Sequence, residues 1–434
     1  MKILDVNNPG FEKEFEEILN RGKMDIEEVE GIVKNIINEV KEEGNKALFR
    51  HIAKFDKWTP KDDSDLEIDK NLMKEAYERL DDKLKKALHL AYDRIKAYHE
   101  KQLPKSWMDY EKNGSILGQK VTPVERAGVY VPGGKAFYPS SLLMNVIPAI
   151  VAGVDEIIVT TPVIENKPNE LLLAALYICG MPRTFKVGGA SAIAALAYGT
   201  ESIPKVDVIT GPGNIFVATA KKLVYGEVNI DMIAGPSEIG IIADSTAKPN
   251  YLAIDLLSQA EHDEMASSIL ITDSKEIANL TAIKVEEFLK GLEREEIARK
   301  SIESRGAIIV TNDIDEAIEL MNKIAPEHLE IMTANPFELL PKIKNAGAIF
   351  LGENTPEPIG DYIAGPNHTL PTGGTAKFYS PLSVEVFMKK SSIIYFSKNA
   401  IEEMGKECAL LAHTEMLTAH EKSVLERLND REGE

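Results

Sequence analysis

The adjacent residues Glu327 and His328 form the first pattern in this sequence that could carry chemistry. They lie in the segment 325–330, which reads APEHLE. An imidazole that titrates near neutrality and a neighbouring carboxyl group can divide the roles of general acid and general base. Adjacent Glu and His residues are also common on solvated surfaces, so the pair alone does not define a catalytic site.

Gln259 and His262 carry side-chain types that bind metal ions. They end an apolar stretch with helical spacing and are three positions apart, so they share one helix face. An imidazole nitrogen and an amide oxygen are both possible metal ligands. A histidine that caps a helix end is the simpler interpretation of this pattern.

The segment 355–374 has neither helical nor strand periodicity. It carries four prolines and four glycines around one aspartate, Asp361, and one histidine, His368. Long structureless segments in compact enzymes are usually functional or disordered. The apolar residues Ile359 and Leu370 within it favour an ordered, functional loop.

The C-terminal segment adds Glu415 and His420, for which a solvated helix face is the alternative. One amide, one carboxylate and two imidazoles, with no thiol, are then available from four separate places in the chain. Such a nitrogen and oxygen donor set suits Zn²⁺ and leaves room for a substrate. The proposed set comprises Gln259, His262, Asp361 and His420.

Three glycine-rich loops lie next to predicted strands: 131–134, 211–214 and 234–238. In open α/β sheets, ligands bind at the carboxyl ends of strands, and a helix N-terminus attracts phosphate. None of the loops is a G-x-G-x-x-G fingerprint, and each could be a tight turn only. Three of them in one α/β region favour a binding site.

Short β-branched runs alternate with helical runs from about residue 121, which predicts parallel sheets covered by helices. The expected fold is α/β, with two doubly wound Rossmann-like units, a short N-terminal arm and a C-terminal helical tail. The predicted strands are 129–131, 157–160, 185–187, 206–210, 239–243, 269–272, 307–310 and 348–351. The predicted domains are an arm (1–25), a discontinuous α/β domain (26–129 and 239–381), an inserted second α/β domain (130–238) and a C-terminal tail (382–434).

Composition limits the class of protein. The chain has 434 residues and a formal net charge of −19, which argues against nucleic acid and anionic membranes as partners. Its most apolar long stretch, 142–154, is shorter than the roughly 20 residues of a membrane span. Two cysteines, Cys179 and Cys408, give no disulfide framework, so we expect a cytoplasmic protein.

Five longer motifs together resemble the histidinol dehydrogenase family over the chain from about residue 115 to the C-terminus. They are IDMIAGPSE through SQAEH (230–262), APEHLE (325–330), GDYIAGPNH (360–368), LPTGGTA (370–376) and LTAH (417–420).

The resemblance implies an enzyme that uses one Zn²⁺ per subunit and two NAD⁺ to oxidise L-histidinol through L-histidinal to L-histidine, the last step of histidine biosynthesis. It also implies that the inserted domain (130–238) binds NAD⁺ and that the tail (382–434) forms a homodimer. In that dimer, the tail brings Glu415 and His420 to the neighbouring subunit's site. The implied roles fall into four groups: catalytic, Glu327 and His328; metal, Gln259, His262, Asp361 and His420; substrate, Ser237, Gln259, His262, His328, Asp361, His368, Glu415 and His420; cofactor, Tyr130, Ser191 and Asn214.

Some positions depart from the family pattern. Ser191 stands where the family often has glutamine, which puts its NAD contact in question, and Met416 replaces a common glycine. Gly240 and Ile254 are also atypical. A zinc hydrolase and a non-catalytic dimer organised by zinc remain alternatives, and the absent G-x-G-x-x-G motif favours the former.

Overall fold

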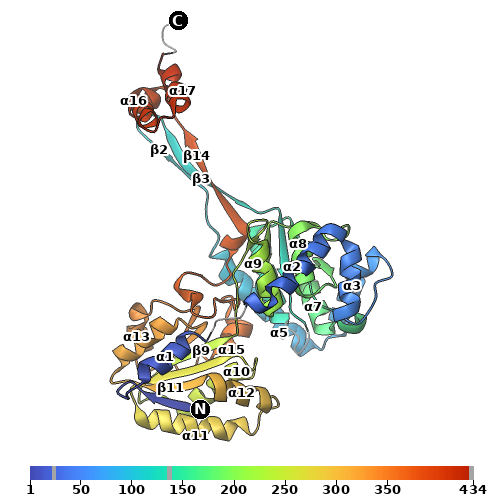
Figure 1. Ribbon diagram of the computed structural model, residues 1–434, viewed down its shortest axis with the longest axis vertical. Coiled ribbons are helices and arrows are strands. Elements are labelled where there is room, and N and C mark those ends of the chain that lie inside the picture. Colours follow the sequence, from blue (N-terminus) through green and yellow to red (C-terminus); the bar gives the residue numbers. More distant parts are fainter. Residues whose placement is uncertain (22–25, 134–138, 430–434) are drawn as a thin grey trace. The chain divides into compact units, whose positions relative to one another are not determined.

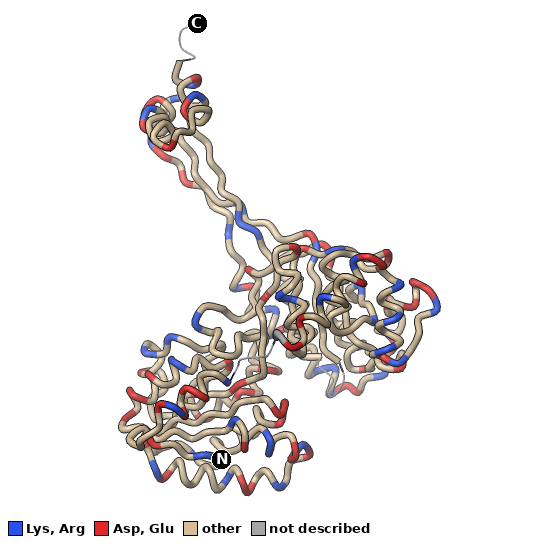
Figure 2. The backbone as a smooth tube through the Cα atoms, viewed as in Figure 1, with Lys and Arg blue, Asp and Glu red and all other residues tan. Residues whose placement is uncertain are grey.

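The computed structural model describes residues 1–21, 26–133 and 139–429, so Gly134 of the predicted loop 131–134 lies outside the described part. The chain divides into two compact units. The first unit comprises Met1–Gln102 and Val124–Phe387, and the second comprises Leu103–Pro123 and Met388–Glu434. Among the described residues, none of the helices combines the length and the hydropathy that a membrane-spanning segment requires. Acidic and basic positions are interspersed along the backbone of each unit (Figure 2).

The first unit contains a six-stranded parallel sheet, here called sheet A, in the order β1-β11-β10-β9-β12-β13 (Figure 1). Its strands are short and mostly apolar because both faces of the sheet are covered by helices. They are β1 (Lys2–Asp5), β9 (Glu238–Ala243), β10 (Ser267–Thr272), β11 (Gly306–Val310), β12 (His328–Met332) and β13 (Ala348–Leu351).

Alternate side chains of β9 enter two different cores. Ile241 packs with α10 (Pro249–Ala260), α11 (Lys275–Leu289) and α12 (Glu295–Arg305). Ile242 packs with α1 (Phe11–Leu19) and α13 (Ile314–Ile324) on the other face. The predicted α/β class is therefore confirmed.

The N-terminal segment 1–21 is part of sheet A rather than a separate arm. Strand β1 pairs in parallel with β11, and Phe11 and Phe15 of α1 are buried in the core. Residues 22–25 of the predicted arm lie outside the described ranges. The sequence did not reveal this packing because β1 is only four residues long.

A second parallel sheet of the first unit, sheet B, has the order β6-β5-β4-β7-β8. The strand order reverses at β4, whose neighbours are β5 and β7, as in a doubly wound sheet. Its strands are β4 (Arg126–Tyr130), β5 (Glu156–Thr160), β6 (Arg183–Phe185), β7 (Val208–Thr210) and β8 (Asn229–Ile230).

The helices before residue 100 pack with sheet B, whereas the predicted boundaries grouped residues 26–129 with 239–381. The apolar stripe of α2, which includes Val33, Ile37 and Val40, is buried against the helices on one face of sheet B. These helices are α2 (Ile26–Glu43), α3 (Asn45–Phe55), α8 (Gly189–Tyr198) and α9 (Ile215–Val224). The other face is covered by α4 (Lys70–Arg79), α5 (Asp82–Glu100), α6 (Pro139–Ala152) and α7 (Glu170–Ile178).

The second unit joins two distant parts of the chain in an antiparallel sheet, β14-β3-β2, followed by a helical hairpin (Figure 1). The elements are β2 (Trp107–Tyr110), β3 (Ile116–Pro123), β14 (Met388–Tyr395), α16 (Lys398–Thr414) and α17 (Thr418–Asn429). The predicted tail thus includes a strand that the sequence did not suggest, and residues 103–123 belong with it. Met416, between the two helices, has φ of 60°, a conformation that suits glycine better than other residues.

The remaining turns are short. They are η1 (Asp63–Leu66), η2 (Ile164–Asn166), α14 (Pro336–Leu339), η3 (Leu340–Lys342), α15 (Glu357–Ile359), η4 (Gly360–Ala364), η5 (Thr375–Lys377) and η6 (Val384–Phe387). Two of these turns, α15 and η4, lie within the segment 355–374, where the sequence predicts a functional loop, and η5 and η6 follow it.

Candidate active site

Glu327 and His328 are buried at the point where β12 begins. Helix α13 ends at Ile324, and Ala325 adopts a left-handed conformation with φ of 50° that turns the chain toward the sheet. The Glu327 side chain is 8 % exposed and that of His328 is 4 % exposed. Burial of this degree excludes the solvated surface pair that the sequence left open.

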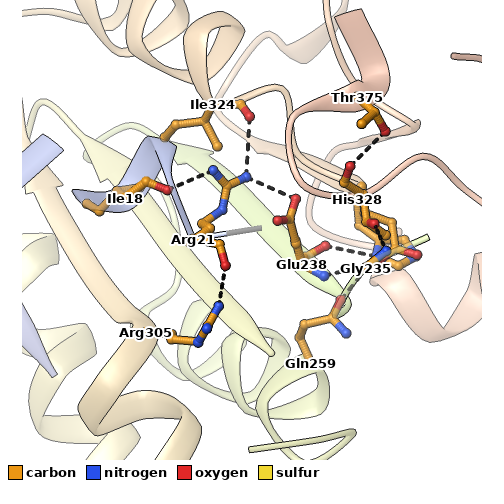
Figure 3. Close-up of polar contacts among 11 residues, drawn as sticks. Ile18, Arg21, Gly235, Glu238, Gln259, Arg305, Ile324, His328 and Thr375 are labelled. Carbon is orange, nitrogen blue, oxygen red and sulfur yellow. Dashed lines mark hydrogen bonds and ion pairs between the residues drawn. The ribbon is translucent and has the colours of Figure 1, made fainter. Parts of the chain in front are cut away.

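Glu238, the first residue of β9, binds both of these residues through its backbone. Its N–H donates to Glu327 Oε2 at 2.9 Å, and its carbonyl oxygen lies 3.0 Å from His328 Nδ1. The Nδ1 atom is also 3.0 Å from Gln259 Oε1, in the last turn of α10 (Figure 3). Residues of β9 and α10, which lie 90 and 69 positions before His328 in the sequence, therefore position its imidazole ring.

Carboxylates surround the other ring nitrogen of His328. Its Nε2 lies 3.5 Å from Asp361 Oδ1 and 3.9 Å from Glu357 Oε1. His368 approaches the same aspartate, with 3.7 Å between its Nδ1 and Asp361 Oδ2. The predicted residues Gln259, His328, Asp361 and His368 thus form one cluster.

Several ionisable groups in this cluster have pKa values far from their ordinary values. Burial raises the pKa of Glu327 to about 8 and that of Glu357 to about 8. Burial alone would lower the pKa of His328, but Glu327, Asp361 and Glu357 raise it to about 10. Burial would likewise raise the pKa of Asp361, yet His328 and His368 hold it well below its usual value. Buried acids that titrate so far from their ordinary range favour a bound cation among them.

A metal ion could be held by His262, Glu357 and Asp361, whose potential ligand atoms all lie within 4.8 Å of one another. Buried polar atoms without a hydrogen-bond partner lie in the same cluster: Gln259 Nε2, His328 Nε2, Glu357 Oε1 and His368 Nε2. The nitrogen and oxygen donors fit Zn²⁺. Glu357 was missed from the sequence, although its position one helical turn before Asp361 was a usable signal.

The other predicted substrate residues fall in both units. Ser237 is half-buried in the loop before β9, and its carbonyl oxygen accepts a hydrogen bond from Ser267. Glu415 and His420 lie in the second unit, where both are exposed. They line one groove of about 580 Å³ together with Cys408, Leu411 and Leu417.

The three predicted cofactor residues line one cavity of about 560 Å³ above sheet B. Tyr130 ends β4, and its hydroxyl accepts a hydrogen bond from Gly189 N–H at 3.2 Å. Asn214 caps α9, and Ser191 Oγ lies 2.8 Å from Nδ1 of His51, which also lines the cavity. The cavity sits at the carboxyl ends of β4 and β7, the place where the strand order reverses and where doubly wound sheets bind ligands.

The cluster on sheet A has the opposite placement. Glu238 and His328 are the first residues of β9 and β12, so this cluster lies at the amino ends of the strands. The expectation that ligands bind at carboxyl ends therefore fits sheet B but not the acid–imidazole cluster on sheet A.

Two doubly wound parallel sheets, one with a buried acid–imidazole cluster and one with a cavity at its switch point, define an α/β protein with a candidate site on each sheet. The family model described as Histidinol dehydrogenase matches residues 19–428. The chain belongs to the histidinol dehydrogenase family, and it is an oxidoreductase of histidine biosynthesis.

Named relatives and a solved structure agree with this assignment. The histidinol dehydrogenase of Sulfurimonas denitrificans is 69% identical over 421 residues, which cover 97% of this chain and 98% of the relative. That of Wolinella succinogenes is 64% identical over 428 residues, with 99% of each chain covered. A crystal structure of histidinol dehydrogenase from Elizabethkingia anophelis is similar, with a TM-score of 0.94, 36% identity and coverage of 99% of this chain and 98% of that one.

Proposed function

We propose that this chain catalyses the four-electron oxidation of L-histidinol through L-histidinal to L-histidine, with two NAD⁺ as hydride acceptors and Zn²⁺ at the cluster on sheet A. The balanced reaction consumes one water and releases two NADH and three protons. The observation that carries the proposal is the buried pair of Glu327 and His328, whose imidazole contacts Glu357 and Asp361, two of the three residues that could hold a metal ion.

We assign the metal to Gln259, His262, Asp361 and His420, the last from a second copy of the chain. Zinc bound there supplies a positive charge that holds and orients the amine and imidazole of the substrate. Ser237, His368 and Glu415 complete the substrate pocket in this proposal. The tail, including Glu415 and His420, then makes the protein a homodimer with shared sites.

We assign the proton transfers of the reaction to Glu327 and His328. A cation bound among Asp361 and Glu357 would offset the carboxylates that raise the pKa of His328. The neutral imidazole would then accept the alcohol proton at Nε2 as the hydride leaves the substrate carbon. Glu327 then removes a proton from the water that hydrates the aldehyde, and His328 accepts a proton again in the second oxidation. Each of these general-base roles is typically worth about 10²- to 10⁴-fold in rate.

The cavity above sheet B is the proposed NAD⁺ site, with Tyr130, Ser191 and Asn214 among its lining residues. Ser191 is shorter than the glutamine common in the family, and its contact with His51 makes this histidine a further candidate for the cofactor site. Two free thiols agree with a reducing compartment, and we propose the cytoplasm.

One assay tests the function. NADH absorbance is followed with limiting histidinol, excess NAD⁺ and added zinc, and two NADH per histidinol are expected. Cleavage of an amide or ester without NADH would instead indicate a zinc hydrolase. Inactivity in both assays would indicate a structural dimer organised by zinc.

A further inference from the structure

Arg21 and Glu238 form a buried ion pair that none of the proposed catalytic steps uses. Arg21 Nη2 lies 2.9 Å from Glu238 Oε2, and the two side chains are only 5 % and 2 % exposed. Removing two charges from water costs free energy that only well-formed hydrogen bonds can recover. A pair of this kind is weak evidence for stability, so its position in the fold is the informative property.

The guanidinium group of Arg21 ties together the ends of two helices on one face of sheet A (Figure 3). Its Nη1 donates to the carbonyl oxygen of Ile18 at 3.0 Å, and its Nη2 donates to that of Ile324 at 3.3 Å. Ile18 lies near the end of α1, and Ile324 is the last residue of α13, three positions before Glu327. Arg305 in turn donates to the carbonyl oxygen of Arg21.

The carboxylate of Glu238 accepts from Arg21 and also from the backbone N–H of Gly373. The carboxylate also accepts a hydrogen bond from the backbone N–H of Glu327, so three groups fix this side chain. Because the same residue donates its N–H to Glu327 and presents its carbonyl oxygen to His328, whatever fixes Glu238 also fixes both of these groups.

The contact with His328 determines which ring nitrogen is available for chemistry. Both atoms near Nδ1, the carbonyl oxygen of Glu238 and Oε1 of Gln259, are hydrogen-bond acceptors. These two acceptors hold a proton on Nδ1 in place. Nε2, which faces Asp361 in the cluster, is the nitrogen whose proton can be exchanged with a substrate.

We infer that the Arg21–Glu238 ion pair is a positioning element for the reaction, which holds the backbone of residue 238 where it orients both Glu327 and His328. Arg21 and Glu238 are positioning residues and do not touch the substrate. The inference rests on the proposed roles of Glu327 and His328. A displacement of about 1 Å in such a site can cost about 10²-fold in rate.

Paired variants separate positioning from stability. Arg21→Met alone leaves a buried, unpaired carboxylate and should lower the melting temperature. Arg21→Met/Glu238→Gln removes that charge and should regain most of the melting temperature, because replacing both members of a buried pair is often neutral. We expect its kcat to remain at least about 10-fold below that of the parent, with bound zinc and the KM for histidinol within about twofold.

Two further variants serve as controls. Arg21→Lys retains the charge but loses the planar fork, and an intermediate kcat is expected. Leu289→Ala, in the core on the opposite face of sheet A, lowers stability by cavity formation and should leave kcat unchanged. The inference is overturned if the double variant has the parent kcat, or if Leu289→Ala lowers kcat to the same extent. Should the double variant fail to fold, a parent-like kcat in Arg21→Lys overturns it.

Crystal structures of the parent and the double variant provide a readout that is independent of turnover. The distance between the carbonyl oxygen of residue 238 and His328 Nδ1 is expected to lengthen beyond hydrogen-bonding range in the variant. An unchanged distance overturns the inference. If the parent protein makes no NADH from histidinol, the proposed function fails, whereas the crystal structures still decide whether the ion pair positions His328.

Discussion

Lys221 and Asp231 form a buried ion pair that holds the Gly211 turn at the end of β7. Lys221 Nζ donates to the Gly211 carbonyl oxygen at 3.0 Å, and the Gly211 N–H donates to Asp231 Oδ2 at 2.9 Å. Gly211 has φ of +118°, and a Cβ atom there would lie 2.0 Å from the backbone oxygen of Tyr130. The turn therefore requires glycine at position 211. It determines how closely the ends of β4 and β7 approach each other beneath the proposed NAD⁺ cavity.

Gly211→Ala should impair cofactor binding, because Tyr130 or the turn must move to admit the methyl group. We expect the KM for NAD⁺ to rise at least about 10-fold, a loss of uniform binding, while bound zinc is unchanged. Steady-state kinetics with varied NAD⁺ measure this effect. Gly153→Ala is the matched control, since Gly153 also has positive φ, +81°, but nothing lies within 4 Å of its Cβ position. Equal KM values in the two variants would contradict the prediction.

Glu357→Gln should weaken metal binding. The substitution removes one negative charge from the group formed with His262 and Asp361 while the side chain keeps its size. We expect about a 10- to 100-fold loss of affinity, read as zinc retained after dialysis against graded chelator. Glu353→Gln alters an exposed carboxylate of the same loop that pairs with Lys248 and should retain zinc as the parent does. Equal retention in both variants would exclude Glu357 from the metal site.

Glu327→Gln should separate the two oxidations. The amide can still accept a hydrogen bond from Glu238 but cannot remove a proton from water. We expect histidinal oxidation to fall by about 10²- to 10⁴-fold and histidinol oxidation to fall by less than about 10-fold, as measured by stopped-flow absorbance with each substrate. Glu338→Gln, at an exposed position, should change neither rate. Equal losses in both half-reactions of Glu327→Gln would refute this division of labour.

Asp56 should make stability depend on pH. Burial raises the pKa of its carboxyl group from 3.8 to about 6, so the folded state binds a proton that the unfolded chain releases. Stability is then lost as pH rises from about 4 to about 6, by about 1–3 kcal/mol in total. Asp56→Asn should exceed the parent in stability by this amount at pH 8 and by little at pH 4, measured by urea unfolding without NAD⁺.

Asp82→Asn provides the reference for this measurement, because Asp82 is fully exposed at the start of α5. It should differ from the parent by less than about 0.5 kcal/mol at either pH. A constant difference between Asp56→Asn and the parent from pH 4 to pH 8 would show that Asp56 is not desolvated in the fold.

Hybrid dimers test the shared site. Chains with His328→Ala and chains with His420→Ala are inactive alone in this scheme, but a dimer of one of each has one intact site. Random exchange of equal amounts should restore about a quarter of the parent activity per site. Each variant exchanged with itself is the control, and mass spectrometry confirms the exchange. No recovery after confirmed exchange would place each site within one subunit.

Local patterns predicted the alternation of helical runs with most central strands of both sheets, because apolar periodicity depends only on which face of an element is buried. They did not predict the helices α1, α3 and α12. They failed at β12, where the charged residue Glu330 lies inside a fully buried strand. They also did not show which sheet α2 packs on. An apolar stripe indicates that one face of a helix is buried, but it does not identify the partner.

Some residues of the candidate site were likewise recognisable from local patterns in the sequence, and others were not. Gln259 and His262 were recognisable because they share one helix end, and Glu327 and His328 because they are adjacent. Arg21 was not recognisable as part of the site. Its partner, Glu238, is 217 residues away in the sequence, and a lone arginine in a charged segment has no local signature. A contact between residues so far apart in the sequence depends on how α1 and α13 pack on sheet A.

The cluster on sheet A lies at the amino ends of its strands, whereas the cavity above sheet B lies at the carboxyl ends of its strands. The two sites therefore face opposite ends of the neighbouring helices. Helices α10 and α13 run toward the cluster on sheet A with their C-terminal ends, which carry partial negative charge. Helices α8 and α9 present their N-terminal ends, with partial positive charge, to the cavity above sheet B. Under the proposed function, a chain with a net charge of −19 would thereby offer the anionic pyrophosphate of NAD⁺ a locally positive site. It would offer a metal ion or an ammonium group a locally negative one. In this proposal, the directions of the helix dipoles direct the cofactor and the substrate to different sites, and the net charge of the chain does not determine either one.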